Sequence, residues 1–339
     1  MRAVRLTGTK HVELIERPVP EPKPDQAVIA VEQRGICGSD IHAYHGRHPF
    51  MHPPVVLGHE FAGRIARVGS EIGGSLEEGQ PVTVEPSLVC GECYNCRTGR
   101  YNICDNLQVI GCTTDGGFAD YVAVPAEKVV PLPEGMSMAQ GAMVEPLAVA
   151  YHALKVGGFE SGMRAVVLGA GPIGLVTLLA LREQKADRVL VTDIADEKLA
   201  MAEELGADMA LRGDDDEMVQ RARNFLERRA DVVFDCVTNR YSVAQAVALA
   251  QKGGRVVVEG VAAGEVPVPL HLLQDREVEL RGTLMYTRED FEAAIEAMSS
   301  GRVEVNPLIT DEYPLERVPD AFERIDTAPN EVVKVQIGS

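Results

Sequence analysis

The stretch AVVLGAGPIGLVTLLALREQ at 165–184 carries the strongest fold signal in this chain. An apolar run at 165–168, typical of a buried strand, leads into a glycine-rich loop, and the loop opens a helix expected at 174–184. The glycines let the backbone approach a pyrophosphate, and the N–H groups of the helix N-terminus bind its phosphates. The residues expected to contact the dinucleotide are Gly169, Gly171, Pro172, Ile173 and Gly174.

A second signal of dinucleotide binding follows the next expected strand, at 188–192. Asp193 ends this strand, nineteen residues after Gly174. An acidic residue here accepts hydrogen bonds from the adenosine ribose hydroxyls and repels a 2′-phosphate, so the sequence favours NAD over NADP. Lys198 is a further candidate for a ribose contact, although a lysine on an exposed helix is more often a solvated charge.

The glycine-rich loop belongs to a longer alternation of strand-like and helix-like segments. This alternation predicts an α/β domain with a doubly wound parallel sheet. The expected strands are 165–168, 188–192, 231–235 and 254–258, and the expected helices are 174–184, 196–205 and 242–250.

Residues 1–150 have a different texture. Short Val and Ile runs broken by Gly and Pro indicate a compact, mostly antiparallel β domain. Thr287 and Asp290 form a capping-box-like start to a helix that ends near Gly301, and the tail is expected to return to this first domain. A chain of 339 residues also exceeds the size at which a single core usually stops growing, which favours two domains.

Charge restricts the partners of the chain. Its 33 Lys and Arg residues against 51 Asp and Glu residues give a net charge of −18, which repels nucleic-acid phosphates and anionic membrane surfaces. The longest apolar run, 165–181, holds three glycines and a proline and is shorter than the roughly 20 residues of a membrane span. No apolar signal segment lies near Met1, so we expect a cytoplasmic protein without nucleic-acid or membrane partners.

Four of the seven cysteines form the pattern C-x2-C-x2-C-x7-C: Cys90, Cys93, Cys96 and Cys104. On a turn-rich loop this spacing can wrap one ion in four thiolates, the closed shell of structural zinc. The alternatives are an iron-sulfur cluster and a redox dithiol. The bacterial iron-sulfur run has a shorter last gap and a following proline, and a thioredoxin-like motif would need only two cysteines near a strand-helix unit. Cys112 and Cys236 stand alone and are expected to be small buried side chains.

Cys37, His59 and Glu60 indicate a second metal site. They bring a thiolate, an imidazole and a carboxylate within reach of one zinc ion, and three mixed ligands leave a fourth position open for chemistry. Isolated, Cys37 and His59 would be interpreted as core residues, but Ser39 and other polar side chains lie close by. Glu145 is a further candidate, because a carboxylate in apolar company needs a cation or a hydrogen-bond partner to remain charged.

In combination these motifs resemble the zinc-dependent medium-chain alcohol dehydrogenases, and among them the polyol and sugar-acid branch. The His59-Glu60 pair, the four-cysteine lobe, the VEPL segment at 144–147, the glycine-rich loop and Asp193 appear in the family's order and cover essentially the whole chain. The resemblance implies two domains with the active site in the cleft between them. These are a chaperonin-10-like β catalytic domain at 1–150 and 286–339, with a zinc lobe at 88–106, and a Rossmann NAD-binding domain at 151–285.

The resemblance also implies two zinc ions per chain, one catalytic and one structural, and NAD, with Val261 at the cofactor site. Cys37 and His59 are the implied catalytic ligands. Related enzymes differ in whether Glu60 or Glu145 binds zinc directly while the other holds a zinc-bound water.

A route for the substrate proton follows from the same resemblance. Zinc lowers the pKa of the alcohol hydroxyl, a hydride passes to the nicotinamide, and the proton leaves through Ser39, the nicotinamide ribose and His42. Asp40 is expected to orient His59.

Signals for the substrate are weaker. His45, Arg47, His48 and His52 either bind a polyhydroxylated or carboxylated substrate or lie at the surface. Met285 falls where sorbitol dehydrogenases usually carry an arginine, which argues against sorbitol itself.

The favoured substrates are a polyol or an idonate-, gulonate- or galactonate-type sugar acid, with 2,3-butanediol or L-threonine as alternatives. The alternative of another class is a non-catalytic nicotinamide-binding protein with structural zinc. The family implies a homo-oligomer, a dimer or a tetramer, and of these we expect a homotetramer.

Overall fold

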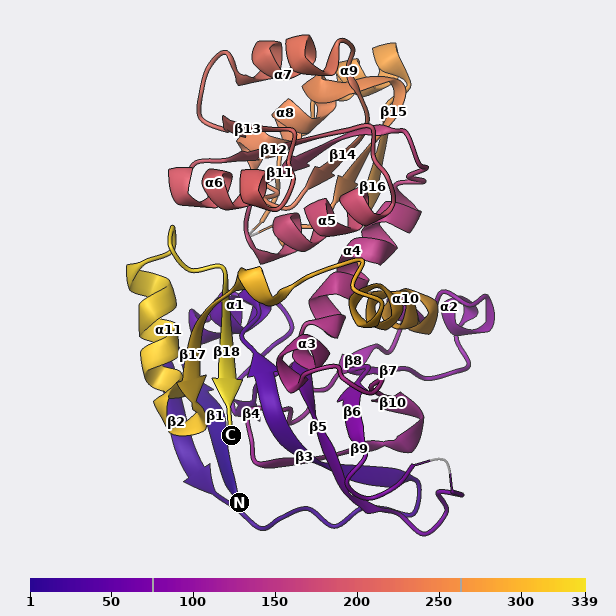
Figure 1. Cartoon of the computed structure of the whole chain (residues 1–339), viewed down its shortest axis with the longest axis vertical. Helices are drawn as coiled ribbons and strands as arrows, with labels where there is room; N and C mark the ends of the chain where they lie inside the picture. Colours follow the sequence, from indigo (N-terminus) through magenta and orange to yellow (C-terminus); the bar gives the residue numbers. More distant parts are fainter. Residues whose placement is uncertain (75, 263) are drawn as a thin grey trace. The chain divides into compact units, whose positions relative to one another are not determined.

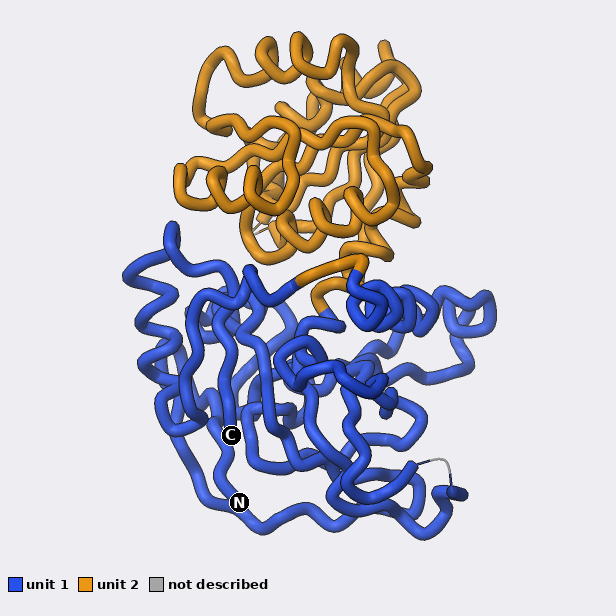
Figure 2. The backbone as a smooth tube through the Cα atoms, in the orientation of Figure 1, with its two compact units in different colours: residues 1–145, 287–301, 305–339 blue, residues 146–286, 302–304 orange. Residues whose placement is uncertain are grey.

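The structure is a computed structural model that describes residues 1–74, 76–262 and 264–339. The chain forms two compact units, shown in different colours in Figure 2. One unit comprises Met1–Glu145, Thr287–Gly301 and Val305–Ser339, and the other comprises Pro146–Tyr286 and Arg302–Glu304. The first unit is therefore discontinuous in sequence, because the chain leaves it after Glu145 and returns at Thr287.

The unit that begins at Pro146 contains a six-stranded parallel sheet in the order β13-β12-β11-β14-β15-β16, with helices packed around it (Figure 1). Its strands are β11 (Arg164–Leu168), β12 (Arg188–Asp193), β13 (Met209–Arg212), β14 (Ala230–Asp235), β15 (Ala250–Val258) and β16 (Glu279–Gly282). Its helices are α5 (Pro172–Glu183), α6 (Asp196–Glu204), α7 (Met218–Leu226), α8 (Arg240–Leu249) and α9 (Leu270–Arg276), preceded by α4 (Val144–Val156), which leads into this unit. The strand order reverses between β11 and β14, and ligands of doubly wound sheets bind at such a point.

The sequence pattern identified this sheet because its central strands are buried on both faces. Residues 165–168 of β11 are at most 1% exposed, which explains the unbroken apolar run. The helix expected from 174 begins two residues earlier, at Pro172, since the fixed φ of proline suits the first helical position. The elements α4, β13, α7, α9 and β16 were not predicted.

The unit that begins at Met1 is mainly antiparallel, as predicted. Its largest sheet has the order β10-β6-β5-β3-β18-β17, with β9 also paired to β3, and only β17 and β18 of this sheet run parallel. Its strands are β3 (Gln26–Gly35), β5 (Glu60–Val68), β6 (Pro81–Val84), β9 (Tyr121–Pro125), β10 (Val129–Pro131), β17 (Ile309–Pro314) and β18 (Lys334–Gly338). A second sheet pairs β1 (Arg2–Gly8) with β2 (His11–Glu16) and β4 (Val55–Val56), and a third pairs β7 (Ser87–Leu88) with β8 (Gln108–Val109).

Short helices surround these sheets. They are α1 (Gly38–Tyr44), α2 (Tyr94–Arg97), α3 (Met138–Ala142), α10 (Arg288–Ser299) and α11 (Val318–Thr327), with single 3-10 turns η1 (Tyr101–Ile103), η2 (Ala126–Lys128), η3 (Asn306–Leu308) and η4 (Leu315–Arg317). The predicted capping box is confirmed, because the side chains of Thr287 and Asp290 cap the start of α10. Among the described residues, no helix has the length and apolarity that crossing a membrane requires.

Candidate functional site

The first turn of α1 fixes the position of Cys37. Cys37 is the N-cap of this helix, and its backbone N–H donates to Oδ2 of Asp40 at 2.9 Å. Asp40 is fully buried, and this burial raises the pKa of its carboxyl group to about 6. The capping bond therefore ties the backbone of Cys37 to a carboxyl group inside the core.

Cys37 meets His59 and Glu60 at the start of β5. One ligand atom from each residue lies within 4.8 Å of the others: Sγ of Cys37, a ring nitrogen of His59 and a carboxylate oxygen of Glu60. His59 and Glu60 are buried, whereas Cys37 is half-buried. Zinc binds such donors at about 2.0–2.3 Å, so atoms at these separations fit around one ion. The folded chain thus brings together three of the four residues predicted for the catalytic metal.

The two ring nitrogens of His59 have different neighbours. Nε2 lies 3.4 Å from Oγ of Ser39, and Nδ1 lies 3.5 Å from Sγ of Cys112 and 3.7 Å from Oδ1 of Asp40. Burial lowers the pKa of His59, but the charges of Cys112, Asp40 and Cys37 outweigh burial and raise this pKa well above its usual value. An imidazole must be neutral to bind zinc, so metal binding here would release a proton.

The expectation that Cys112 and Cys236 are small buried side chains holds only in part. Both are half-buried, and each sulfur contacts a polar side chain. Sγ of Cys112 faces His59, and Sγ of Cys236 lies 3.6 Å from Oε1 of Glu259. These partners are 53 and 23 residues away in sequence, so no local pattern could have indicated the contacts.

Glu60 has a partner that the sequence analysis missed. Nζ of Lys334, on β18, lies 2.8 Å from both carboxylate oxygens of Glu60 and 3.2 Å from the carbonyl oxygen of Ile36. Both side chains are only 1% exposed. The pair is 274 residues apart in sequence and meets because β18 and β5 both pair with β3.

Glu145, the second candidate carboxylate, is also buried and lies at the start of α4. The negative charges of Glu145 and Glu60 both raise the pKa of Lys334. Glu60 is the carboxylate whose oxygen lies within 4.8 Å of the donor atoms of both Cys37 and His59. This geometry favours Glu60 as a direct ligand.

Ser39 and His42 share one side of α1. They are three residues apart, a spacing that brings side chains together on a helix, and both are half-buried. Burial lowers the pKa of His42, and the charges of Arg47 and His45 lower it further. The imidazole of His42 is therefore neutral near pH 7 and can accept a proton.

The loop after α1 contributes less to the site than its histidines suggested. Nε2 of His45 lies 2.8 Å from Oδ1 of Asp326, and Nδ1 of His48 accepts two backbone N–H groups of its own loop. Arg47 and His52 are exposed. Two of the four candidates thus have structural partners, and the other two lie at the surface.

The four-cysteine lobe has the dimensions of a tetrahedral thiolate site. All four sulfur atoms lie within 4.8 Å of one another, and three of the separations are 3.5, 3.9 and 4.0 Å. Tetrahedral zinc with bonds of about 2.3 Å would separate its sulfurs by about 3.8 Å. The residues are those predicted: Cys90, Cys93, Cys96 and Cys104.

The glycine-rich loop lies between β11 and α5. Gly169 has a φ of +98°, which favours glycine, and Gly171 is the N-cap before Pro172. Ile173 and Gly174 belong to the first turn of α5, whose N-terminal N–H groups suit a phosphate. This geometry fits the pyrophosphate of a dinucleotide.

Asp193 is tied to this loop. Its Oδ2 accepts the backbone N–H of Ala170 at 2.7 Å, and its Oδ1 accepts two backbone N–H groups that follow it. The free lone pairs of this carboxylate remain available to ribose hydroxyls. Lys198 is half-buried on α6, and Val261 is 51% exposed beyond the end of β15.

A half-buried acid beside the loop also escaped the sequence analysis. Oγ1 of Thr177, on α5, lies 3.4 Å from Oε2 of Glu259, which follows β15. Burial raises the pKa of Glu259 to about 8, so a large fraction of this side chain is protonated near neutral pH. The sequence offers no sign of it, because Glu259 follows an ordinary apolar strand.

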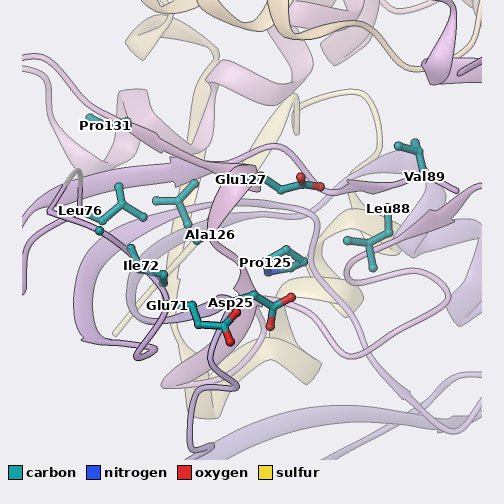
Figure 3. Close-up of a pocket in the computed structure, with 12 residues that line it drawn as sticks. Asp25, Glu71, Ile72, Leu76, Leu88, Val89, Pro125, Ala126, Glu127 and Pro131 are labelled. Atoms are coloured by element: carbon teal, nitrogen blue, oxygen red, sulfur yellow. The ribbon is translucent and has the colours of Figure 1, made fainter. Parts of the chain in front are cut away.

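A surface hollow in the first unit, drawn in Figure 3, lacks such chemistry. Its described lining contains no histidine or cysteine, and its charged side chains are all acidic. The residues are Asp25, Glu71, Ile72, Gly73, Leu76, Leu88, Val89, Pro125, Ala126, Glu127, Val129 and Pro131. Its carboxylates would repel an anionic substrate or cofactor.

A parallel sheet with a glycine-rich loop at its switch point, in one chain with two sets of zinc donors, defines a zinc-dependent nicotinamide dehydrogenase. Residues 23–134 match the alcohol dehydrogenase GroES-like domain, and residues 172–300 match the zinc-binding dehydrogenase family. The chain belongs to the zinc-type alcohol dehydrogenase family, in the branch of sorbitol, L-idonate and butanediol dehydrogenases. It is a zinc-binding, NAD-dependent oxidoreductase, and its two donor sets correspond to two zinc ions.

Two characterised relatives illustrate the similarity. L-idonate 5-dehydrogenase of Vitis vinifera is 35% identical over 95% of this chain and 90% of its own length. Sorbitol dehydrogenase of Bacillus subtilis is 32% identical over 99% of this chain and 97% of its own length.

Two solved structures carry nicotinamide cofactors. A short chain alcohol dehydrogenase from E. coli CFT073, complexed with NADH, has a TM-score of 0.94 and 30% identity and covers 100% of this chain and 99% of its own. A zinc-binding dehydrogenase from Sinorhizobium meliloti, bound to NADP, also has a TM-score of 0.94, with 32% identity and the same coverage.

Proposed function

We propose that this chain oxidises a secondary alcohol of a polyol or sugar acid to a ketone and transfers the hydride to NAD. The observation that carries the proposal is the meeting of Cys37, His59 and Glu60 within 4.8 Å on a chain that also has a dinucleotide loop. A closed four-thiolate site would only brace the fold, whereas three mixed donors leave a position open for substrate.

Each unit has its own part in this proposal. The unit that begins at Met1 holds both metal sites and the alcohol, and the unit that begins at Pro146 binds NAD. Bound zinc acts as a Lewis acid that lowers the pKa of an alcohol hydroxyl. Cys37, His59 and Glu60 would hold this ion, with Glu145 as the second carboxylate near Lys334.

The chain's own side chains then move the proton. Ser39, whose Oγ lies 3.4 Å from Nε2 of His59, would accept the proton of the alcohol while it releases its own hydroxyl proton. That proton would reach His42, on the same helix α1, by way of the nicotinamide ribose. His42 is suited to this step because its lowered pKa keeps it neutral near pH 7.

The cofactor preference rests on Asp193. Its carboxylate, held against the backbone of Ala170, would repel the extra phosphate of NADP. The relative bound to NADP shows that this fold accommodates either cofactor, so a local charge of this kind decides the choice.

For the substrate class we favour polyols and sugar acids, because the characterised relatives include sorbitol and L-idonate dehydrogenases. Met285 is half-buried with a φ of +53°, and this residue lacks the arginine charge expected for sorbitol itself. A small diol such as 2,3-butanediol, or L-threonine, remains the second candidate, since a butanediol dehydrogenase shares the fold with 27% identity.

The test is a screen for NADH absorbance over polyols, aldonates, 2,3-butanediol and L-threonine with the zinc-loaded protein. We expect turnover with a polyol or aldonate, loss of turnover in Cys37→Ser, and retained NAD binding in that variant. Full activity of Cys37→Ser would reject the catalytic role of this metal site. NAD binding by the wild type without turnover on any alcohol would instead support a non-catalytic nicotinamide-binding protein.

We further propose a homo-oligomer, a dimer or a tetramer. Strand β16 ends its sheet and is exposed along its whole length, and Leu270, Leu280 and Leu284 nearby are 70%, 37% and 52% exposed. An unpaired edge with apolar side chains favours pairing with a second copy. Light scattering that shows a stable monomer at micromolar concentration would reject this proposal.

A further inference from the structure

The proposed reaction leaves the buried ammonium group of Lys334 without a role. Its Nζ contacts three oxygens, two from Glu60 at 2.8 Å and the carbonyl of Ile36 at 3.2 Å. An ammonium group has three N–H donors, so these three contacts use all of them. Lys334 is therefore held by the carboxylate that would also bind zinc.

Glu60 has little freedom to move away from Lys334. A Cβ atom on Gly35 would lie 2.0 Å from Oε2 of Glu60, so the carboxylate packs directly on the backbone of Gly35. These two residues face each other in the pairing of β3 with β5. The carboxylate is thus confined between a backbone, an ammonium group and the donor atoms of Cys37 and His59.

The charges around Lys334 are mostly negative. Among the charged groups, Glu60 raises the pKa of Lys334 most strongly, and Cys37 and Glu145 raise it as well. A buried carboxylate without a cation nearby is unfavourable, and the ammonium group supplies that cation when no metal is bound. Once zinc is bound, two cations compete for the lone pairs of Glu60.

We infer that Lys334 is a positioning residue that shares Glu60 with the catalytic zinc and so limits how tightly the carboxylate holds this ion. The inference rests on the proposed zinc site and adds a regulator to it. Removing the ammonium group frees the lone pairs of Glu60 and removes a positive charge near the metal, and both effects strengthen zinc binding. If Lys334 merely braced Glu60, its removal would weaken zinc binding instead.

The test measures zinc release from the purified protein by a zinc-chelating dye, without any substrate. Cys37→Ser identifies the phase that belongs to the catalytic site, and the four-cysteine lobe supplies the other phase. We expect Lys334→Met to release the catalytic zinc about tenfold more slowly than the wild type, a change as large as the smallest usual effect of mutating a partner of a metal ligand but opposite in direction. Lys334→Arg retains a positive charge that can pair with both oxygens of Glu60, so it should release the catalytic zinc faster than Lys334→Met.

Two further variants complete the test. The double variant Lys334→Met with Glu60→Gln is compared with Glu60→Gln alone. Here Lys334→Met should slow zinc release much less than it does in the wild type, because no carboxylate is left to be freed and only the loss of the positive charge remains. Lys128→Met is the matched control, since Lys128 is also buried and lies 3.6 Å from the buried Glu85, and it should leave the catalytic phase unchanged. If Lys334→Met does not fold, Lys334→Gln replaces it in the test, because glutamine retains hydrogen-bond donors without the charge. This variant should also release the catalytic zinc more slowly than the wild type.

Release from folded Lys334→Met at the wild-type rate or faster would overturn the inference. Because zinc release is measured without substrate, this outcome is separate from the alcohol screen. A wild type that binds zinc and NAD but oxidises no alcohol would overturn the proposed function and leave the zinc-release comparison valid.

Discussion

A Cβ atom on Gly174 would lie 1.8 Å from the carbonyl oxygen of Gly169. The first turn of α5 thus packs directly on the end of β11, and only a glycine permits this approach. A Cβ atom on Gly171, between them, would have no heavy atom of another part of the chain within 4 Å, so this position has room for a side chain.

We expect Gly174→Ala to destabilise the protein by about 1–3 kcal/mol, because the added methyl group overlaps the backbone of Gly169. NADH binding, measured by fluorescence titration, should weaken at the same time. Gly171→Ala is the matched control and should retain the melting temperature while binding NADH more weakly, since Gly171 is the N-cap of α5, at the helix end where the pyrophosphate is expected. An equal loss of stability in both variants would contradict this account.

The four-cysteine lobe predicts a metal count. Cys104 is 7% exposed, and its sulfur accepts backbone N–H groups from Cys90 and Asn106. Cys104→Ser should lower the zinc content, measured by atomic absorption, from two ions per chain to one and should lower the melting temperature. Cys236→Ser, outside both donor sets, should keep both ions, and retention of two ions by Cys104→Ser would reject the four-thiolate site.

A pH dependence follows from His42. Burial and the charge of Arg47 lower its pKa, so the imidazole is a neutral proton acceptor above that pKa and is protonated below it. The turnover number kcat should fall as the pH drops through this lowered pKa, below about 6.5. His42→Ala should lower kcat by about tenfold or more and lose this acid limb. His45→Ala should keep the limb, because His45 pairs with Asp326. An unchanged pH profile in His42→Ala would remove His42 from the proton route.

A second pH dependence concerns stability. Burial raises the folded-state pKa of Glu259 to about 8 from an ordinary value of 4.5. The unfolded chain loses this proton more readily, so Glu259 reduces stability increasingly as the pH rises from about 4.5 to about 8. Glu259→Gln should therefore raise the free energy of unfolding by about 2 kcal/mol at pH 8, less than the full shift implies because the residue keeps some contact with water. Below pH 4.5 the variant and the wild type should be equally stable.

Urea unfolding at several pH values checks this prediction. Glu197→Gln, an exposed glutamate on α6, is the control and should show no such trend. A stability difference for Glu259→Gln that does not grow with pH would show that the fold does not hold this carboxyl group in its protonated form.

Local patterns in the sequence were enough to identify the parallel sheet, the glycine-rich loop with Asp193 and the four-cysteine lobe. Apolar runs, glycine spacing and cysteine spacing can each be recognised within a stretch of at most about thirty residues. Segments without such a local pattern were missed. The strand β16 is exposed along its length and lacks the apolar run that identified β11.

The surroundings of the catalytic donors depend on the tertiary structure. Lys334 reaches Glu60 across 274 residues, and Cys112 reaches His59 across 53, through strand pairings and loops that no local pattern encodes. The sequence was therefore sufficient to identify the candidate ligands Cys37, His59, Glu60 and Glu145. The fold determined which carboxylate lies beside Cys37 and His59, and which cation shares it, because buried charges find their partners through long-range packing.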